Sequence, residues 1–264
     1  MKNFLNRIKF MISKINIYFR YKKKSISCGI KWILFGKEIS NFTYEIKNEK
    51  ELLHVVQIIT GTDYEILKKL LNEINFEDNE FKNFLSDDFY SSYSKKKIFG
   101  RRLLWFLLIR TLKPDLVIES GVDKKLGSTI LIYGLFKNYL EGHKNSEFIG
   151  LDIKNNKTSY FNLDNKNFIN YKFYYEDTLS FLSKYDKRKK ILYISDAAHN
   201  YDFENQEYNL IKKNLGAGSI IISDSNSGSL SDFSIQNKKN IIFFHEKVNN
   251  FWYDGAITAV SYFY

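Results

Sequence analysis

The chain has 264 residues, of which 44% are hydrophobic and 27% charged, and this composition excludes a disordered chain and favours one packed domain with a small extension. The single cysteine, Cys28, excludes an internal disulfide, and the longest apolar run, Leu103 to Ile109, is far shorter than the roughly 20 residues that cross a bilayer. No cleavable leader is recognisable, so a cytoplasmic protein is expected.

The formal net charge of +10 is concentrated at the N-terminus. Residues 1–24 hold eight basic and no acidic side chains, which leaves +2 for the other 240 residues. Phe4, Ile8, Met11 and Ile15 recur at helical spacing, so this segment is predicted to form a basic amphipathic helix. It would pack on the body or on a second copy in a homodimer, or lie on the inner face of a membrane. Nearly all of the excess positive charge lies in this terminal segment and does not form a basic face beside the predicted site, so a nucleic-acid partner is not expected.

The first third of the chain reads as a helical cap. A short strand is expected near Phe42–Ile46, helices over Glu49–Ile59 and Tyr64–Ile74, and an irregular segment over residues 75–95. A largely buried helix follows and ends at Pro114, because proline cannot continue a helix. The predicted domains are an N-terminal helical extension and cap, residues 1–95, and a Rossmann-like domain, residues 96–264.

From Asp115 onward, apolar strands alternate with helices. The strands are "DLVIES", "EFIGLDI", "YKFYYED", "KILYISD" and "SIIISD", and helices are expected at residues 127–140, 178–184 and 203–214. This alternation predicts an α/β fold with a parallel sheet covered on both faces. The last strands, "NIIFFHE" and "AITAVSYFY", have no long helix between them and are predicted to form an antiparallel pair at one edge.

Polar residues follow the ends of these strands, where open parallel sheets bind ligands. In chain order they are Glu119 with Gly121, Asp152, Glu176 with Asp177, Asp196, and Asp224. A glycine at position 121 permits positive φ and close approach of a ligand to the backbone. Asp123 would face the pyrophosphate of a dinucleotide, which argues for a cofactor with an ammonium group and a ribose instead. A helix cap or a solvated loop acid is the alternative for each carboxylate.

The motifs "VIESGVDKKLGS", "GLDI" and "YYEDTLSFL" resemble those of class I S-adenosylmethionine-dependent methyltransferases. The longer segments at residues 101–128, 194–226 and 243–256 resemble a bacterial group of these enzymes with a helical N-terminal extension and no assigned acceptor. The resemblance covers about residues 115–264, and it implies a mostly parallel sheet with a C-terminal antiparallel hairpin. S-adenosylmethionine is the implied cofactor. Its implied contacts are Glu119, Gly121, Asp123, Ser128, Asp152, Ile153, Glu176, Asp177 and Asp196.

Methyl transfer to a hydroxyl requires removal of a proton, and His199, three residues after Asp196, is the candidate general base. These two residues form the predicted catalytic pair. Related O-methyltransferases bind a divalent cation, which implies a magnesium site made by Asp196, Asp224 and Asn226. The match departs from the similar "D-x-D-H" pattern, because Ala198 stands where the second acid would be.

The predicted activity is O-methylation of a small polar acceptor, and the resemblance suggests a sugar or surface-glycan precursor in carbohydrate biosynthesis. The segments 86–97, 225–233 and 249–255 carry aromatic and hydroxyl side chains that would surround the acceptor. Two alternatives remain open from the sequence. One is an inactive Rossmann-like scaffold in an envelope-associated assembly, and the other is a nicotinamide oxidoreductase, which Asp123 and the final hairpin disfavour.

Overall fold

The computed structural model describes residues 44–74, 79–84, 101–122, 126–154, 170–224, 227–246 and 257–263, together with Leu5, Ile8, Lys9, Ile12 and Leu34. The amphipathic helix predicted for residues 1–24 therefore lies outside the described residues, apart from four positions that are helical. None of the described helices is both long and apolar enough to cross a membrane.

A mixed sheet of eight strands forms the centre of the molecule, in the order β1-β7-β8-β6-β5-β2-β3-β4. The strands are β1 (Tyr44–Ile46), β2 (Leu116–Ser120), β3 (Glu147–Leu151), β4 (Asn170–Tyr174), β5 (Ile191–Ser195), β6 (Ser219–Ser223), β7 (Asn240–Glu246) and β8 (Ile257–Phe263). Strands β2 to β6 are parallel to one another, and β8 runs antiparallel to both β6 and β7. Strands β2, β5 and β6 are buried along their whole length, which explains their continuous apolar sequences.

This arrangement confirms the predicted fold class, with one difference at the edge of the sheet. The antiparallel pair β7–β8 forms as predicted, but β1 pairs with β7 in parallel and is the outermost strand. A strand from the N-terminal segment therefore completes the sheet. Pairing between residues 44–46 and 244–246 joins parts of the chain about 200 residues apart, and local sequence patterns carry no information about such pairing.

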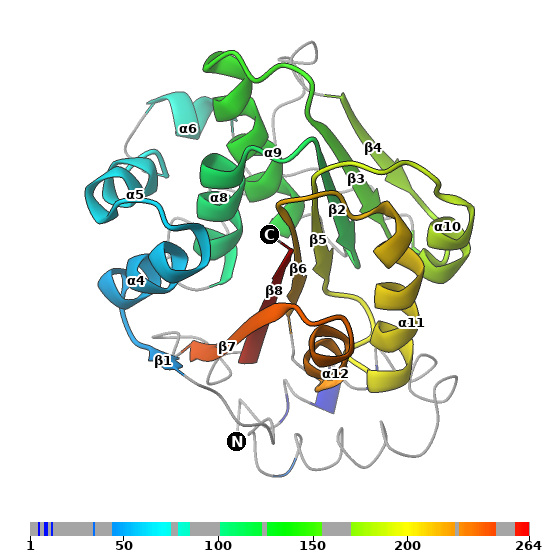
Figure 1. The fold of residues 1–264 in the computed structure, drawn as a ribbon. Helices are drawn as coiled ribbons and strands as arrows, with labels where there is room; N and C mark the ends of the chain where they lie inside the picture. The colour runs from blue at the N-terminus through cyan, green and yellow to red at the C-terminus, as the bar shows by residue number, and fades with distance from the viewer. Residues whose placement is uncertain are drawn as a thin grey trace.

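Helices cover both faces of the sheet (Figure 1). One face packs against α4 (Glu49–Thr60), α5 (Tyr64–Leu71), α6 (Asn79–Phe84), α8 (Arg101–Leu112) and α9 (Leu126–Leu140). The other face packs against α10 (Thr178–Lys184), α11 (Tyr201–Ile211), which continues as the short 3₁₀-helix η2 (Lys212–Asn214), and α12 (Ser229–Gln236). The run Leu103 to Ile109 is almost completely buried within α8, as predicted.

Two helices occupy segments that the sequence indicated as irregular. Helix α6 lies inside the predicted loop 75–95, and α12 begins inside the segment 225–233, which the sequence predicts to contact the acceptor, and continues to Gln236. In α12, Leu230 and Phe233 are buried one turn apart, so part of this segment packs in the core. Four serines and Gly228 within 225–233 conceal this apolar spacing, because such residues are typical of loops.

A buried arginine connects the N-terminal helices to the sheet domain. The Arg110 side chain, in α8, is fully buried, and its Nε lies 2.7 Å from Glu73 Oε2, just after α5. Its Nη2 lies 2.5 Å from Glu141 Oε1, just after α9, and Nη1 donates to Asn138. Burial disfavours the charge, but hydrogen bonds to both carboxylates leave the pKa of Arg110 raised. The hydrogen bond from Arg110 lowers the pKa of Glu141 to about 2.

Replacing Arg110 with leucine is expected to lower the free energy of unfolding by about 2–4 kcal/mol, because Glu73 and Glu141 lose a buried partner while remaining partly solvated. Urea denaturation measures this change. Lys113→Ala is the matched control, since Lys113 and Glu141 form an exposed ion pair worth about 0–1 kcal/mol. Equal effects of the two substitutions would show that the buried network contributes no more than a surface pair.

Candidate functional site

The carboxyl ends of the central strands are aligned. Ser120, the last residue of β2, lies opposite Leu151 of β3 and Ser195 of β5. Leu151 in turn lies opposite Tyr174, and Ser195 lies opposite Ser223. The order of strands reverses between β2 and β5, and ligands of open α/β sheets bind at such a point.

Backbone hydrogen bonds continue one residue beyond these ends. The amide of Asp196 donates to the Ser120 carbonyl (2.8 Å), and the amide of Asp224 donates to the Ser195 carbonyl (3.0 Å). On the other side, the amide of Gly121 donates to Leu151 (2.8 Å) and that of Asp152 donates to Tyr174 (3.1 Å). The structure therefore brings together the residues that follow four different strands.

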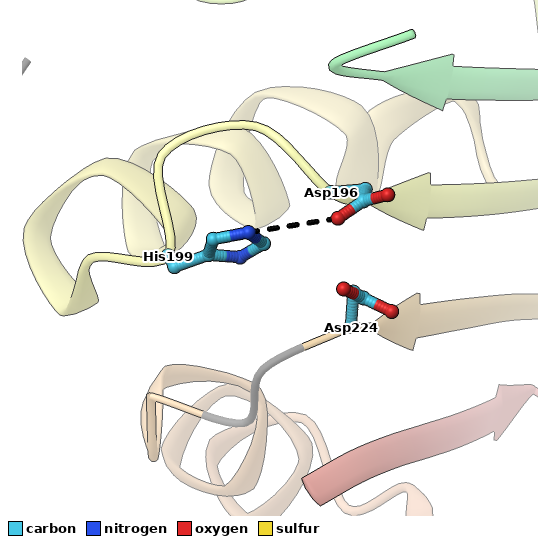
Figure 2. Close-up of side chains that lie close together, drawn as sticks. All are labelled: Asp196, His199 and Asp224. Carbon is cyan, nitrogen blue, oxygen red and sulfur yellow. Dashed lines mark ion pairs between the residues drawn. The ribbon is translucent and has the colours of Figure 1, made fainter. Parts of the chain in front are cut away.

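Asp196 and Asp224 form a compact cluster with His199, which lies in the loop after β5 (Figure 2). Asp196, His199 and Asp224 each offer one ligand atom, and these atoms lie within 4.8 Å of one another. His199 Nε2 lies 3.6 Å from Asp196 Oδ1, and both side chains are about one-fifth exposed. Asp224 is buried, with 3% of its surface exposed.

The backbone holds His199 in an unusual conformation. Its φ is 48°, in the left-handed region that few residues other than glycine adopt. The next residue, Asn200, caps α11 by accepting hydrogen bonds from the amides of Asp202 (2.9 Å) and Phe203 (3.3 Å). A fixed loop between β5 and α11 thus directs the imidazole toward Asp196. Such strain is found often at functional sites, where the surroundings fix it.

Gly121 allows two loops to meet. Its φ is 89°, and an added Cβ would lie 2.5 Å from the Asp196 carbonyl oxygen and 2.6 Å from Ala197 Cα. The sequence suggested that this glycine admits a ligand, but in the structure the space is taken by the β5–α11 loop. The missing side chain therefore fixes the loop that carries Asp196 and His199.

Glu119 and Ser128 lie beneath the site. Glu119 is 1% exposed and accepts a hydrogen bond from the buried Ser128 hydroxyl at the start of α9. Gly127 permits this packing, because an added Cβ would lie 2.5 Å from Trp105 and 2.6 Å from Glu119 Oε1. Burial raises the pKa of Glu119 to about 8. Glu119 and Ser128 are predicted cofactor contacts, but both side chains are buried. Side chains alternate along a strand, and that of Glu119 points toward α9.

The remaining predicted contacts have varied surroundings. Asp152 is half-buried and accepts from the Lys154 amide (2.9 Å), while Ile153 is exposed. Glu176 pairs with Lys184 at 3.6 Å, and Asp177 caps α10 by accepting from the Ser180 amide (3.1 Å). Asp177 therefore has the helix-cap role that the sequence left as an alternative. Asp123 and Asn226 lie outside the described residues.

Sequence reasoning missed a polar layer immediately below the cluster. Ser120, Ser195 and Ser223 end their strands and contact two buried glutamates of α11, Glu204 and Glu207. A signal was present, because the strands "LVIES", "ILYIS" and "SIIIS" all end in serine.

A separate cavity of about 390 Å³ lies beside β4 and α10. Its walls include Tyr174, Phe181 and Tyr185 together with Lys172 and Lys187. None of the three clustered side chains lines it, so it is distinct from the candidate site.

No protein-family model matches the chain, and no curated protein matches it. Its structure is similar to an O-methyltransferase from Bacillus cereus in complex with SAH, with 10% identity over 81% of this chain and 97% of that one and a TM-score of 0.43. It is also similar to an SAH-bound methyltransferase from Podospora anserina, with 13% identity over 86% of this chain and 99% of that one and a TM-score of 0.40. A third similar structure is an rRNA methylase from Streptococcus thermophilus, with 9% identity over 63% of this chain and 98% of that one and a TM-score of 0.43.

At these sequence identities and TM-scores, the similarities concern the fold alone. The description of the fold therefore rests on the strand order of this chain. That order, with five parallel strands followed by an antiparallel pair, is the order implied by the resemblance to class I S-adenosylmethionine-dependent methyltransferases. The chain has a Rossmann-like fold that ends in an antiparallel pair, extended by strand β1 and the N-terminal helices.

Glu119→Gln is expected to flatten the dependence of stability on pH. The Glu119 pKa is raised in the folded state, so its stabilising contribution is present below about pH 4.5 and is lost as the pH rises toward 8. The loss amounts to at most about 1.4 kcal/mol per pH unit. Thermal denaturation between pH 5 and 9 should show a smaller decline for the variant than for the wild type.

Glu147→Gln is the matched control, because a hydrogen bond from Lys189 lowers the pKa of Glu147 and its contribution is lost only as the pH falls. A Glu119→Gln protein with an unchanged decline at alkaline pH would mean that this carboxyl is ionised in the folded state.

Proposed function

We propose that the protein is an S-adenosylmethionine-dependent O-methyltransferase that acts on a small polar acceptor. The observation that carries the proposal is the cluster of Asp196, His199 and Asp224 at the carboxyl ends of β5 and β6, beside the reversal of strand order. A base and two carboxylates at this position suit a reaction between a cationic methyl donor and a hydroxyl. The similarity to methyltransferase structures is consistent with this donor.

The donor would lie along the ends of β2, β3 and β4. Asp152 follows β3 and is half-buried, and we assign its carboxylate to the ribose hydroxyls, a role that carboxylates take at this position of the topology. Asp177, the cap residue of α10, would contact the adenine amine, as the family resemblance implies. The acids at these strand ends would also favour the positive charge of a sulfonium.

His199 would accept the proton of the acceptor hydroxyl. As that O–H bond breaks, the oxygen attacks the methyl carbon, the carbon–sulfur bond breaks, and the electron pair leaves with sulfur as the thioether S-adenosylhomocysteine. The Asp196 carboxylate, 3.6 Å from Nε2, stabilises the imidazolium that results. The fixed loop geometry keeps the base in place during the displacement.

The donor set also fits a divalent cation. Asp196 and Asp224 supply the oxygen ligands that magnesium and manganese prefer, and their ligand atoms lie within 4.8 Å of each other. A bound cation would polarise the acceptor hydroxyl and so favour its ionisation. We include this cation in the proposal, with Asn226 as a third ligand predicted from the sequence.

The acceptor is proposed from its chemistry. A polar site with a base and two carboxylates suits a compound that carries a free hydroxyl, such as a sugar or a nucleotide-sugar that contributes to a surface glycan. This acceptor class rests on the family resemblance, so the experiment compares sugars, nucleotide-sugars and phenolic alcohols as acceptors.

S-adenosylhomocysteine is expected to bind the wild-type protein in calorimetric titration and to raise its melting temperature, whereas NAD⁺ is expected to do neither. His199→Asn is expected to retain this binding and to lose turnover by about 10²–10⁴-fold. Asparagine is the matched replacement, because it tolerates positive φ but cannot act as a base. A protein that binds NAD⁺ but not S-adenosylhomocysteine would support the oxidoreductase alternative.

Removal of divalent cations with EDTA is expected to lower turnover, and added Mg²⁺ or Mn²⁺ should restore it. Asp224→Asn should raise the cation concentration needed for half-maximal activity, since an amide is a weaker ligand than a carboxylate. Full activity in EDTA would remove the cation from the mechanism and leave His199 as the base.

A further inference from the structure

Three serines occupy equivalent positions at the ends of the central strands. Ser120, Ser195 and Ser223 are the last residues of β2, β5 and β6, lie side by side in register, and are at most 1% exposed. Their side chains point to the sheet face covered by α11, since they contact its two buried glutamates. Three hydroxyls thus form a row directly below the residues of the candidate site.

Glu207 joins two of these strand ends. Its Oε1 accepts from Ser120 Oγ (2.5 Å) and Tyr193 Oη (2.9 Å), and its Oε2 accepts from Ser195 Oγ (2.6 Å). Glu204, one turn earlier in α11, accepts from Ser223 Oγ (3.4 Å) and Ser227 Oγ (2.5 Å). Both glutamates are completely buried.

The same serines hold the candidate site through their backbone. The Ser120 carbonyl accepts the amide of Asp196, and the Ser195 carbonyl accepts the amide of Asp224. A rotation or shift of either serine would therefore move the carboxylate that follows the neighbouring strand. Glu207 fixes both serines at once, because each of its oxygens is committed to a different strand.

We propose that Glu207 is a positioning residue of the candidate site, which sets the relative placement of Asp196, His199 and Asp224 by clamping the ends of β2 and β5. The consequence for catalysis rests on the proposed methyltransferase function, whereas the placement itself does not. Outer residues of this kind commonly change activity by about 10–100-fold when they are replaced.

The charge of Glu207 affects the clamp. Burial raises its pKa to about 7, although the hydrogen bonds from Ser120, Ser195 and Tyr193 oppose the shift. The other titratable groups that act on this region are Asp177 at the start of α10 and Glu204 and Tyr208 on α11. As a carboxylate Glu207 accepts from all three hydroxyls, but once protonated it must donate to one of them. The clamp is therefore complete above neutral pH and loosens below it.

The first test compares crystal structures of the wild type and Glu207→Gln, grown in the same crystal form. Glutamine has one donor end and one acceptor end, so the serine that faces the amide nitrogen must accept instead of donate. Its short bond to the carboxylate is then replaced by a longer N–H···O bond of about 2.9 Å. We expect the loops that carry Asp196, His199 and Asp224 to shift relative to one another. An unchanged arrangement of these three side chains would overturn the proposal, whether or not the protein is a methyltransferase.

The second test measures turnover and its pH dependence with an acceptor found in the panel. Glu207→Gln is expected to lower kcat by about 10–100-fold, with the KM for S-adenosylmethionine within about threefold of the wild type. Tyr193→Phe is the matched variant, because it removes one donor to Glu207 and leaves the hydrogen bonds from Ser120 and Ser195 to Glu207 in place. It should keep the wild-type kcat at alkaline pH and move the acidic limb of the profile to higher pH.

The outcomes separate the two proposals. A wild type that neither binds S-adenosylhomocysteine nor methylates any acceptor contradicts the proposed function, and the crystal structures then decide the role of Glu207. An active wild type whose kcat is unchanged in Glu207→Gln contradicts the positioning role alone. If Glu207→Gln does not fold, Ser195→Ala removes the hydrogen bond between Ser195 and Glu207 instead. A shift of the Asp224 backbone is then expected, because its amide donates to the Ser195 carbonyl.

Discussion

The aligned ends of β2 to β6 are the constraint on which the candidate site depends. Because the ends are in register, the hydrogen bonds of the sheet continue one residue further and fix the backbones of Asp152, Asp196 and Asp224. The side chains then have little freedom except rotation about their own bonds. A site built in this way is carried by the most rigid part of the fold, although its residues come from distant parts of the sequence.

This placement gathers negative charge in a small volume. The carboxylates of Asp152 and Asp224 add to the effect of burial in raising the pKa of Glu119. A cation at the strand ends would relieve this repulsion, and both a sulfonium and a divalent metal ion have the required charge. These carboxylates therefore favour a positively charged ligand at the strand ends, and Arg102, which lowers the pKa of Glu119, offsets part of this effect.

Much of this architecture could be predicted from the sequence because it follows from local patterns. Each central strand is a short apolar run that ends before a polar residue, and parallel strands place such ends at one edge. The face on which Glu119 lies could also have been inferred, since its neighbours alternate between the two sides of the sheet. Its assignment to the cofactor came from the family resemblance, which carries no such information.

Other features depend on contacts that no local pattern records. The edge position of β1 arises from pairing with β7. Position 121 requires glycine because Ala197, in another loop, packs against its backbone. The polar layer could be predicted only in part. The serines are visible at the strand ends, but only the packing of α11 on the sheet shows that Glu204 and Glu207 turn inward to meet them.

That layer bears on the choice between an enzyme and an inactive scaffold. Two buried carboxylates cost desolvation energy, and well-packed apolar side chains in the same positions would often give an equally stable or more stable core. In a protein that served only as a scaffold, Glu207 would order the ends of β2 and β5 without any reactive groups to align. A protein that must hold Asp196 and Asp224 at a fixed separation does gain from it, because a hydrogen-bonded clamp is more directional than apolar packing. The polar layer lies where a reaction requires fixed geometry, and this placement favours the enzyme.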